Sequence, residues 1–285
     1  RCCIDRNMKI EDIVTLALNE DVGDGDHTSL ATIPPNAIGK AVLIAKDHGI
    51  LAGISVAKIV FRQVDEQIKV NTFIADGSPI KKGDQIFVVS GRAQSLLTAE
   101  RTALNFLQRM SGIATFTNKL TTELNGLTTK LLDTRKTTAC NRAIEKLAVK
   151  LGGGYNHRFG LFDMIMIKDN HVDFAGGIKN AINATNSYLK EKSKELKIEI
   201  EVRNFAELEE VLSIGRINRI MLDNFSPADL KKAIKMINQA YETEASGNIN
   251  LNNIREYAET GVDYISVGAL THQVKSLDMS LKAIK

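Results

Sequence analysis

The second half of the chain alternates short apolar segments with longer amphipathic ones. The apolar segments of strand length are Leu131-Leu132, Met164 to Ile167, Ile198 to Val202, Ile220 to Leu222, a weaker one ending near Ala245, and Tyr264 to Val267. Strands that alternate with helices are typical of a parallel sheet. No segment indicates an antiparallel hairpin or a reversal of the sheet, and a complete barrel has eight strands. We therefore predict an α/β fold with an incomplete, six- or seven-stranded α/β barrel.

The segments between these strands carry helix signals. One apolar stripe recurs at helical spacing from Ile178 to Leu189. Ser226 followed by Pro227 and Asp229 predicts a helix start, with a capping serine, a proline at the first helical position and an acid three residues after the cap. Gly261 is expected to end a helix that begins near Leu251.

The first part of the chain has a different, non-repeating pattern. Residues 41–45 and 86–89 are expected to be strands, and a long helix is expected from about Thr98 to Leu124. We predict an N-terminal α/β domain over residues 1–115 and a barrel catalytic domain over residues 116–273. The C-terminal tail, residues 274–285, is expected to pack on the first domain.

Composition and charge narrow the class of protein. The chain has 285 residues, of which 44% are hydrophobic and 25% charged, as in a soluble globular protein. A net charge of +3 is too small to indicate nucleic acid or an anionic membrane as a partner. Neither a membrane span nor a signal peptide is expected. Three cysteines (Cys2, Cys3 and Cys140) without metal-ligand spacing favour a reduced, cytoplasmic location.

Polar residues follow the predicted strands. In α/β barrels the functional groups lie at the carboxyl ends of the strands. The polar strand ends are residues 133–138, residues 168–171, Glu201, Asp223-Asn224, residues 246–248 and residues 268–272. If the barrel prediction is right, these six ends meet at one mouth.

The strand ends also differ in charge. A basic cluster made of Arg135, Lys136, His157, Arg158 and Lys168 indicates a substrate with several negative charges. Glu201 and Asp223, on adjacent predicted strands, could hold Mg²⁺ together with phosphate oxygens, bond ribose hydroxyls or stabilise a positively charged sugar. The residues alone leave these three roles open.

Glycines mark further candidate contacts. Ser246-Gly247-Asn248 and Gly268-Ala269 can present backbone N–H groups to an anion, and a helix starting at Asn250-Leu251 would favour phosphate at its N-terminus. Three successive glycines, residues 152–154, could let the backbone approach a ligand or let His157 and Arg158 turn toward one.

Six motifs occur in the order known from one enzyme family. They are Glu100-Arg101-Thr102-Ala103-Leu104-Asn105, Asp133-Thr134-Arg135-Lys136-Thr137-Thr138, Asn156-His157-Arg158, Lys168-Asp169-Asn170-His171, Leu222-Asp223-Asn224-Phe225 and Glu244-Ala245-Ser246-Gly247. From residue 20 to the C-terminus the chain resembles nicotinate-nucleotide pyrophosphorylase (carboxylating), also called quinolinate phosphoribosyltransferase. The resemblance implies an N-terminal α/β sandwich and an incomplete barrel. It also implies that quinolinate and phosphoribosyl pyrophosphate, with Mg²⁺, give nicotinate mononucleotide, pyrophosphate and CO₂ in de novo NAD biosynthesis.

The resemblance assigns roles to matching positions. The family's quinolinate carboxylates are surrounded by residues that match Arg135, His157, Arg158 and Lys168, with Lys136 nearby. Residues matching Glu201 and Asp223 face the ribose and the metal, directly or indirectly. We expect Lys136, Glu201 and Asp223 to be catalytic. The remaining expected substrate contacts are Thr134, Ser246, Gly247, Asn248, Gly268, Ala269 and His272. The resemblance further implies a homodimer with a shared active site, in which Arg101 enters the neighbouring subunit's barrel.

Three departures from the family pattern and three alternatives remain. The segment before Glu244 looks shortened, and Tyr241-Glu242-Thr243 is a poor strand sequence. Residues 139–141 are Ala-Cys-Asn where the family has a rigid Pro-Gly turn, and Asn248 stands where many members have a second glycine. Asparagine tolerates left-handed dihedral angles, so this turn is expected to survive. The alternatives are a paralogue with another acceptor, such as the molybdenum-associated homologues, a Schiff-base aldolase with Lys168 as nucleophile, and a non-catalytic sensor of a phosphate ligand.

Overall fold

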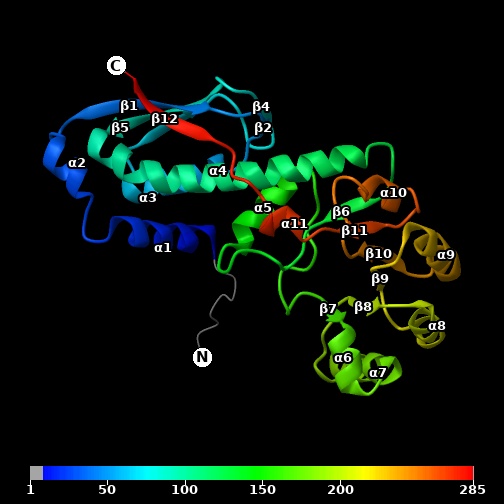
Figure 1. The fold of residues 1–285 in the computed structure, drawn as a ribbon. Helices are drawn as coiled ribbons and strands as arrows, with labels where there is room; N and C mark the ends of the chain where they lie inside the picture. The colour runs from blue at the N-terminus through cyan, green and yellow to red at the C-terminus, as the bar shows by residue number, and fades with distance from the viewer. Residues whose placement is uncertain (1–8, 285) are drawn as a thin grey trace. The chain divides into compact units, whose positions relative to one another are not determined.

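A computed structural model describes residues 9–284, which fall into two compact units (Figure 1). The first unit extends to Asn118 and also contains Thr137–Gly153 and the chain from Leu270 onward; the second contains Lys119–Lys136 and Gly154–Ala269. The sequence pattern had placed Thr137–Gly153 in the barrel domain. Cys2 and Cys3 lie outside the described residues. Within residues 9–284, no helix combines the length and the apolar character needed to cross a membrane.

The first unit is built on an antiparallel sheet with strand order β12-β1-β5-β3. Its elements are α1 (Ile10–Val22), α2 (His27–Thr32), β1 (Ile38–Ala45), β2 (Gly49–Ile50), α3 (Ile54–Val64), β3 (Lys69–Thr72), β4 (Pro79–Ile80), β5 (Gln85–Arg92), most of α4 (Ala93–Glu123), α5 (Arg142–Leu151), most of α11 (Ala269–His272) and β12 (Met279–Ile284). The two predicted strands lie within β1 and β5 and are confirmed. The C-terminal strand β12 pairs with β1 from Lys40↔Ile284 to Ala45↔Met279.

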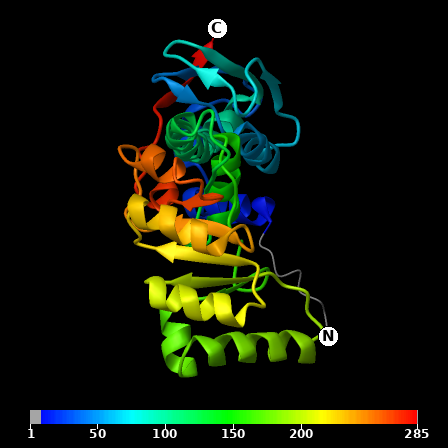
Figure 2. The ribbon, with the colours of Figure 1, turned by 90° about the vertical axis from the view of Figure 1, so that its right-hand side faces the viewer.

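Helix α4 lies against one face of this sheet (Figures 1 and 2). It begins at Ala93 rather than at the predicted Thr98, because the chain enters the helix directly after β5, where the Ala93 N–H donates to the Ala37 carbonyl at 2.7 Å. Helix α3 contributes Phe61, whose ring meets that of Phe87 edge to face at 6.0 Å. These contacts form the apolar core of the first unit.

The second unit is a six-stranded parallel sheet. Its elements are β6 (Lys130–Leu132), β7 (Ile165–Ile167), α6 (Asp169–Ala175), α7 (Ile178–Glu191), β8 (Ile198–Val202), α8 (Phe205–Ile214), β9 (Arg219–Asp223), α9 (Pro227–Ile237), β10 (Glu242–Ser246), α10 (Ile254–Ala258) and β11 (Tyr264–Ser266). All six predicted strands are confirmed. The order β6-β11-β10-β9-β8-β7 is that of a barrel in which only the first and second strands do not pair, so the barrel is incomplete as predicted.

The helix signals of the second unit have mixed outcomes. Ser226 caps α9 as predicted, accepting a hydrogen bond from the Asp229 N–H. A helix is present in the range predicted from Leu251 to Gly261, but α10 spans only Ile254–Ala258, so the predicted bounds are wrong. Asparagine side chains take the backbone donors before it: the Asn250 N–H donates to the Asn253 side chain at 2.7 Å. The expected phosphate-binding helix start at Asn250-Leu251 is therefore absent from the described structure.

Packing explains the first glycine of the run at residues 152–154. A Cβ atom on Gly152 would lie 2.4 Å from the Ala114 carbonyl oxygen of α4, so only glycine lets the end of α5 contact that helix. Gly153 has φ +94°, which ends α5 in a conformation that favours glycine. The close contact with α4 gives a packing reason for Gly152, and the expected role of the run toward a ligand stays a prediction.

Candidate active site

Five strands of the second unit and the segment that directly follows β6 contribute to one cavity of about 470 Å³. The lining residues are Thr134, Arg135, Lys136, His157, Arg158, Met166, Lys168, Asp169, Glu201, Met221, Asp223, Glu244, Ser246 and Ser266. Most of the predicted site residues are among them. The polar strand ends therefore meet at one mouth, because parallel strands present their carboxyl ends on the same side.

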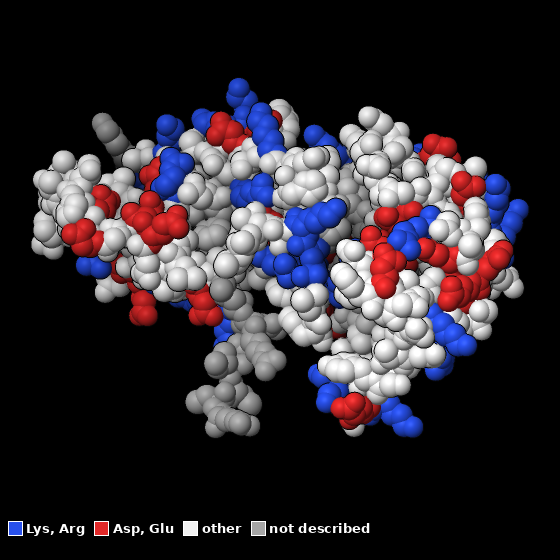
Figure 3. All heavy atoms as spheres, turned by 60° about the horizontal axis from the view of Figure 1, so that its bottom comes forward, with Lys and Arg blue, Asp and Glu red and all other residues white. Residues whose placement is uncertain are grey.

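The basic side of the cavity is electrostatically strained. Arg158 is buried and donates from Nη1 to the Met164 carbonyl at 3.1 Å, but its buried Nε has no hydrogen-bond partner among the described residues. Burial, and then the positive charge of Arg135, lower the pKa of Arg158. A guanidinium in such a place is stabilised by an anionic ligand. Figure 3 shows a compact group of basic side chains near the centre of the face drawn and a separate group of acidic side chains to its right.

The acidic side comes from neighbouring strands β8 and β9. Glu201 Oε2 lies 3.0 Å from Lys168 Nζ, so the two predicted residues form an ion pair across the mouth. Asp223 accepts a hydrogen bond from the Asn224 side chain at 2.7 Å, and Asn224 in turn accepts one from Asn248 at 3.3 Å. Asn248 has φ +53°, which confirms that it adopts the left-handed turn.

Gly247 completes this turn by lacking a side chain. Its φ is +102°, and a Cβ atom would lie 2.2 Å from Asn224 Oδ1 and 2.9 Å from the Asn224 backbone nitrogen. Glycine is therefore required for the turn to contact Asn224 and, through it, to support Asp223.

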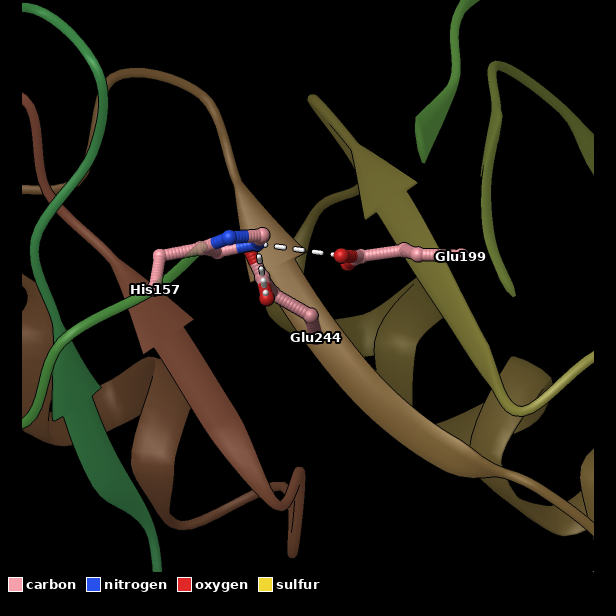
Figure 4. Close-up of side chains that lie close together, drawn as sticks. All are labelled: His157, Glu199 and Glu244. Carbon is pink, nitrogen blue, oxygen red and sulfur yellow. Dashed lines mark ion pairs between the residues drawn. The ribbon is translucent and has the colours of Figure 1, made fainter. Parts of the chain in front are cut away.

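A buried charged cluster lies below the mouth and was missed from the sequence. His157 Nε2 lies 3.0 Å from Glu199 Oε2 and 3.2 Å from Glu244 Oε2 (Figure 4). Arg219 donates from Nη1 to Glu244 at 3.1 Å, and its guanidinium carbon lies 4.0 Å from the centre of the Tyr264 ring. The two glutamates are fully buried.

Burial and mutual charge set the ionisation of this cluster. Burial alone would lower the pKa of His157, but the hydrogen bonds to Glu199 and Glu244 outweigh it and raise the pKa to about 9. Burial and the charge of Glu244 raise the pKa of Glu199 to about 7. For Glu244, burial acts upward, but the His157 hydrogen bond and charge lower its pKa. The Arg158 backbone N–H donates to Nδ1 of His157, so in the neutral ring as well the proton is on Nε2, beside the carboxylates.

Alternation along the strands carried a signal for these residues. In β8 the letters Ile-Glu-Ile-Glu-Val place Glu199 on the same side as Glu201, and in β10 Glu244 shares a side with Ser246. Because Glu201 and Ser246 line the cavity, the period of two points Glu199 and Glu244 into the barrel as well. Barrel interiors are usually filled by branched apolar residues, so charged residues there indicate a functional interior.

The remaining predicted residues lie outside the cavity lining. Gly247, Asn248, Gly268 and Ala269 belong to the second unit, in the turns that follow β10 and β11. Arg101 and His272 belong to the first unit, where both are exposed; Arg101 lies on α4.

The loop that departs from the family pattern is anchored within the first unit. The fully buried Glu145 accepts hydrogen bonds from the backbone and side chain of Thr138, at 3.1 and 2.8 Å, and from Arg109 at 2.9 Å. Cys140 takes a left-handed φ of +61°. Side-chain hydrogen bonds thus hold the segment in which the Pro-Gly turn is missing.

An incomplete parallel α/β barrel whose cavity is lined by Arg135, Lys136, Arg158 and Lys168, with carboxylates from neighbouring strands, has the architecture of a barrel enzyme acting on a multiply charged anion. Comparison with protein families makes the assignment specific. Residues 26–111 match the model "Quinolinate phosphoribosyl transferase, N-terminal domain", and residues 113–282 match the corresponding C-terminal domain. The chain belongs to the quinolinate phosphoribosyl transferase family.

Individual relatives agree. The chain is 46% identical over 288 residues to "Quinolinate phosphoribosyltransferase [decarboxylating] 1b" of Nicotiana tabacum, covering 96% of this chain and 82% of the relative. It is 39% identical to the "Probable nicotinate-nucleotide pyrophosphorylase [carboxylating]" of Bacillus subtilis, covering 96% and 93%. Its fold matches the crystal structure of NadC from Streptococcus pyogenes with a TM-score of 0.91 and 39% identity, covering 98% and 99% of the two chains.

Proposed function

We propose that this chain transfers a phosphoribosyl group from phosphoribosyl pyrophosphate to quinolinate and releases pyrophosphate and CO₂, giving nicotinate mononucleotide for NAD biosynthesis. The observation that carries the proposal is the cavity wall formed by Arg135, Lys136, Arg158 and Lys168, in which the buried Nε of Arg158 has no partner among the described residues. A dicarboxylate would neutralise this wall. Family membership and the names of the relatives support the same reaction.

The chemistry suits the two sides of the cavity. The pyridine nitrogen forms a bond to the anomeric carbon while the bond from that carbon to the pyrophosphate oxygen breaks. Glu201 and Asp223 would stabilise the cationic sugar in the transition state. The 2-carboxylate then leaves as CO₂, the electron pair stays at ring carbon 2 beside the pyridinium nitrogen, and a proton adds there. The site contributes mainly orientation and charge.

Magnesium is part of the proposal. Mg²⁺ is usually held by one or two carboxylates and completed by substrate phosphates. Glu201 and Asp223 both line the cavity, where they are open to a metal ion. Among the described residues, His157, Glu199 and Glu244 also lie close enough together to bind a metal, but there the Arg219 guanidinium already donates to Glu244. The residues therefore fit an ion that arrives with the diphosphate. When bound, it would neutralise the charge of the departing pyrophosphate.

The direct test is pyrophosphate release from quinolinate and phosphoribosyl pyrophosphate, with and without Mg²⁺. We expect turnover with quinolinate, none with nicotinate as acceptor, and loss of turnover when Mg²⁺ is chelated. Turnover with nicotinate and none with quinolinate would assign the scaffold to a different acceptor.

A shared active site in a homodimer is also proposed, with Arg101 supplied by the partner. Arg101 is exposed on α4, as such a role requires. Arg101→Ala and Arg135→Ala variants are each expected to be inactive, but co-expression creates heterodimers in which one of the two sites is intact. Activity should recover to about a quarter of the wild-type value, since half the dimers carry one good site. No recovery would show that each subunit uses its own Arg101.

The cellular location remains a proposal. The low cysteine count favours the cytosol, but the names of relatives from Oryza sativa and Nicotiana tabacum place those proteins in the chloroplast and the mitochondrion. Fractionation of the source cells, with antibody detection of the chain, decides among these compartments.

A further inference from the structure

The imidazole of His157 has protein partners on both nitrogens. Nε2 faces the carboxylates of Glu199 and Glu244 at 3.0 and 3.2 Å, and Nδ1 accepts the backbone N–H of Arg158 at 2.7 Å. The His157 backbone N–H donates to the buried Asp133 at 2.8 Å. The ring, which faces both carboxylates in Figure 4, thus connects the barrel interior to the backbone of Arg158, whose side chain lines the cavity.

The two carboxylates come from strands that do not pair with each other. Glu199 lies on β8 and Glu244 on β10, on either side of β9, which carries Arg219. Arg219 binds Glu244 and also Glu242, the residue two positions earlier on β10. Three strands are therefore held in register around one imidazole by charged contacts in a buried place, where such contacts are strong and their geometry is fixed.

A metal ion does not explain this cluster. Three potential ligand atoms are close together, but Arg219 already places a positive charge on Glu244. The two distances from Nε2 are those of ion pairs, and a protonated imidazole between the two carboxylates accounts for them.

We propose that Glu199 and Glu244 are positioning residues for the anion site: they hold the His157 ring, and the ring holds Arg158 in the orientation that receives the substrate's carboxylate. This inference rests on the proposed function, which supplies the substrate. Neither glutamate needs to contact quinolinate. Their effect passes through His157 to Arg158, whose buried Nε has no hydrogen-bond partner among the described residues.

If Glu199 and Glu244 position Arg158 through His157, the Glu244→Gln variant should have a selective defect in quinolinate binding. Glutamine keeps the size of the side chain and leaves Arg219 paired with Glu242, so the fold is expected to survive. The KM for quinolinate should rise about 10- to 100-fold, by analogy with the loss seen when the hydrogen-bond partner of a metal-binding histidine is removed. The KM for phosphoribosyl pyrophosphate and the kcat should change by less than about threefold, because Arg158 orients the acceptor.

Glu242→Gln is the matched control. Glu242 lies on the same strand and binds the same arginine, but it has no contact with His157 among the described interactions. Its kinetic constants should stay within about twofold of the wild type. Glu199→Gln should repeat the Glu244→Gln effect, since its carboxylate faces the same Nε2.

A measurement without substrate separates positioning from general loss of structure. In ¹⁵N-labelled protein, the ring nitrogen shifts of His157 should change in Glu244→Gln and stay unchanged in Glu242→Gln, while the thermal midpoints of both variants remain near that of the wild type. Unchanged quinolinate KM in Glu244→Gln, or an equal rise in both substrate KM values, would overturn this positioning role. Failure of the wild type to release pyrophosphate would instead refute the proposed function, and the ring shifts would still decide whether the carboxylates hold the imidazole.

Discussion

Arg158→Met should remove substrate binding and leave the fold nearly as stable as before. Arg158 is buried, but its guanidinium donates a hydrogen bond from Nη1 to the Met164 carbonyl, and its Nε is unpartnered among the described residues. Burial and the charge of Arg135 both disfavour its ionised form. Methionine keeps the aliphatic volume and removes the charge.

The two contributions to stability nearly cancel. Loss of a charged hydrogen bond to Met164 costs roughly 1.5–3 kcal/mol, and removal of a buried unsatisfied donor returns roughly 1–3 kcal/mol. The free energy of unfolding without ligand should therefore change by no more than about 2 kcal/mol. Truncating one member of a buried charge pair with the substrate carboxylate costs about 2–5 kcal/mol of binding. At about 1.4 kcal/mol per factor of ten, kcat/KM for quinolinate should fall roughly 30- to several-thousand-fold.

Arg109→Met provides the contrast. Arg109 binds the fully buried Glu145 through Nε and Nη2, so its removal leaves a buried carboxylate without that partner and should cost about 3–5 kcal/mol of stability. Urea unfolding of both variants without ligand, and initial rates of pyrophosphate release by Arg158→Met, make the comparison. If Arg158→Met lowers the free energy of unfolding by more than about 3 kcal/mol, Arg158 is a structural residue. If its kcat/KM for quinolinate stays within about threefold of the wild-type value, Arg158 does not bind the substrate.

Two other predictions concern backbone and pH. Gly247→Ala should displace Asn224 from Asp223, because its Cβ would lie 2.2 Å from Asn224 Oδ1, and should lower kcat at least about tenfold. The control is Gly261→Ala, at a glycine with φ +87° and open space around it, which should lower stability and leave kcat unchanged. Equal losses of kcat in the two variants would contradict the steric argument. The hydrogen bond from Arg92, and next the one from the Gln67 N–H, lower the pKa of Asp65 in the folded protein. The ionised Asp65 therefore contributes stability that is fully present above about pH 4 and is lost as the pH falls through the lowered pKa of the folded state. Asp65→Asn should therefore be less stable than the wild type by roughly 1–3 kcal/mol at pH 7, with the difference in urea midpoint vanishing toward pH 2; a constant difference would refute the assignment.

Much of the second unit followed from local pattern. Apolar runs of strand length predicted all six strands, and the Ser226-Pro227 signal placed the start of α9 correctly. Convergence of the polar strand ends followed from connectivity, since parallel strands joined by helices present their carboxyl ends on the same side. The bounds of α10 did not follow, because asparagine side chains compete with the helix for backbone donors in a way that propensity does not encode.

The sequence by itself determined which residues stand at the strand ends, and hence that a basic wall faces two carboxylates. Alternation also fixed which side of β8 carries Glu199. Only the tertiary structure decided that Glu199, on β8, and Glu244, on β10, meet at the one ring of His157, which arrives from a loop before β7. The physical reason is that a period of two fixes the face of a strand, whereas the partner across a barrel interior depends on strand register, closure and the length of side chains that belong to distant segments.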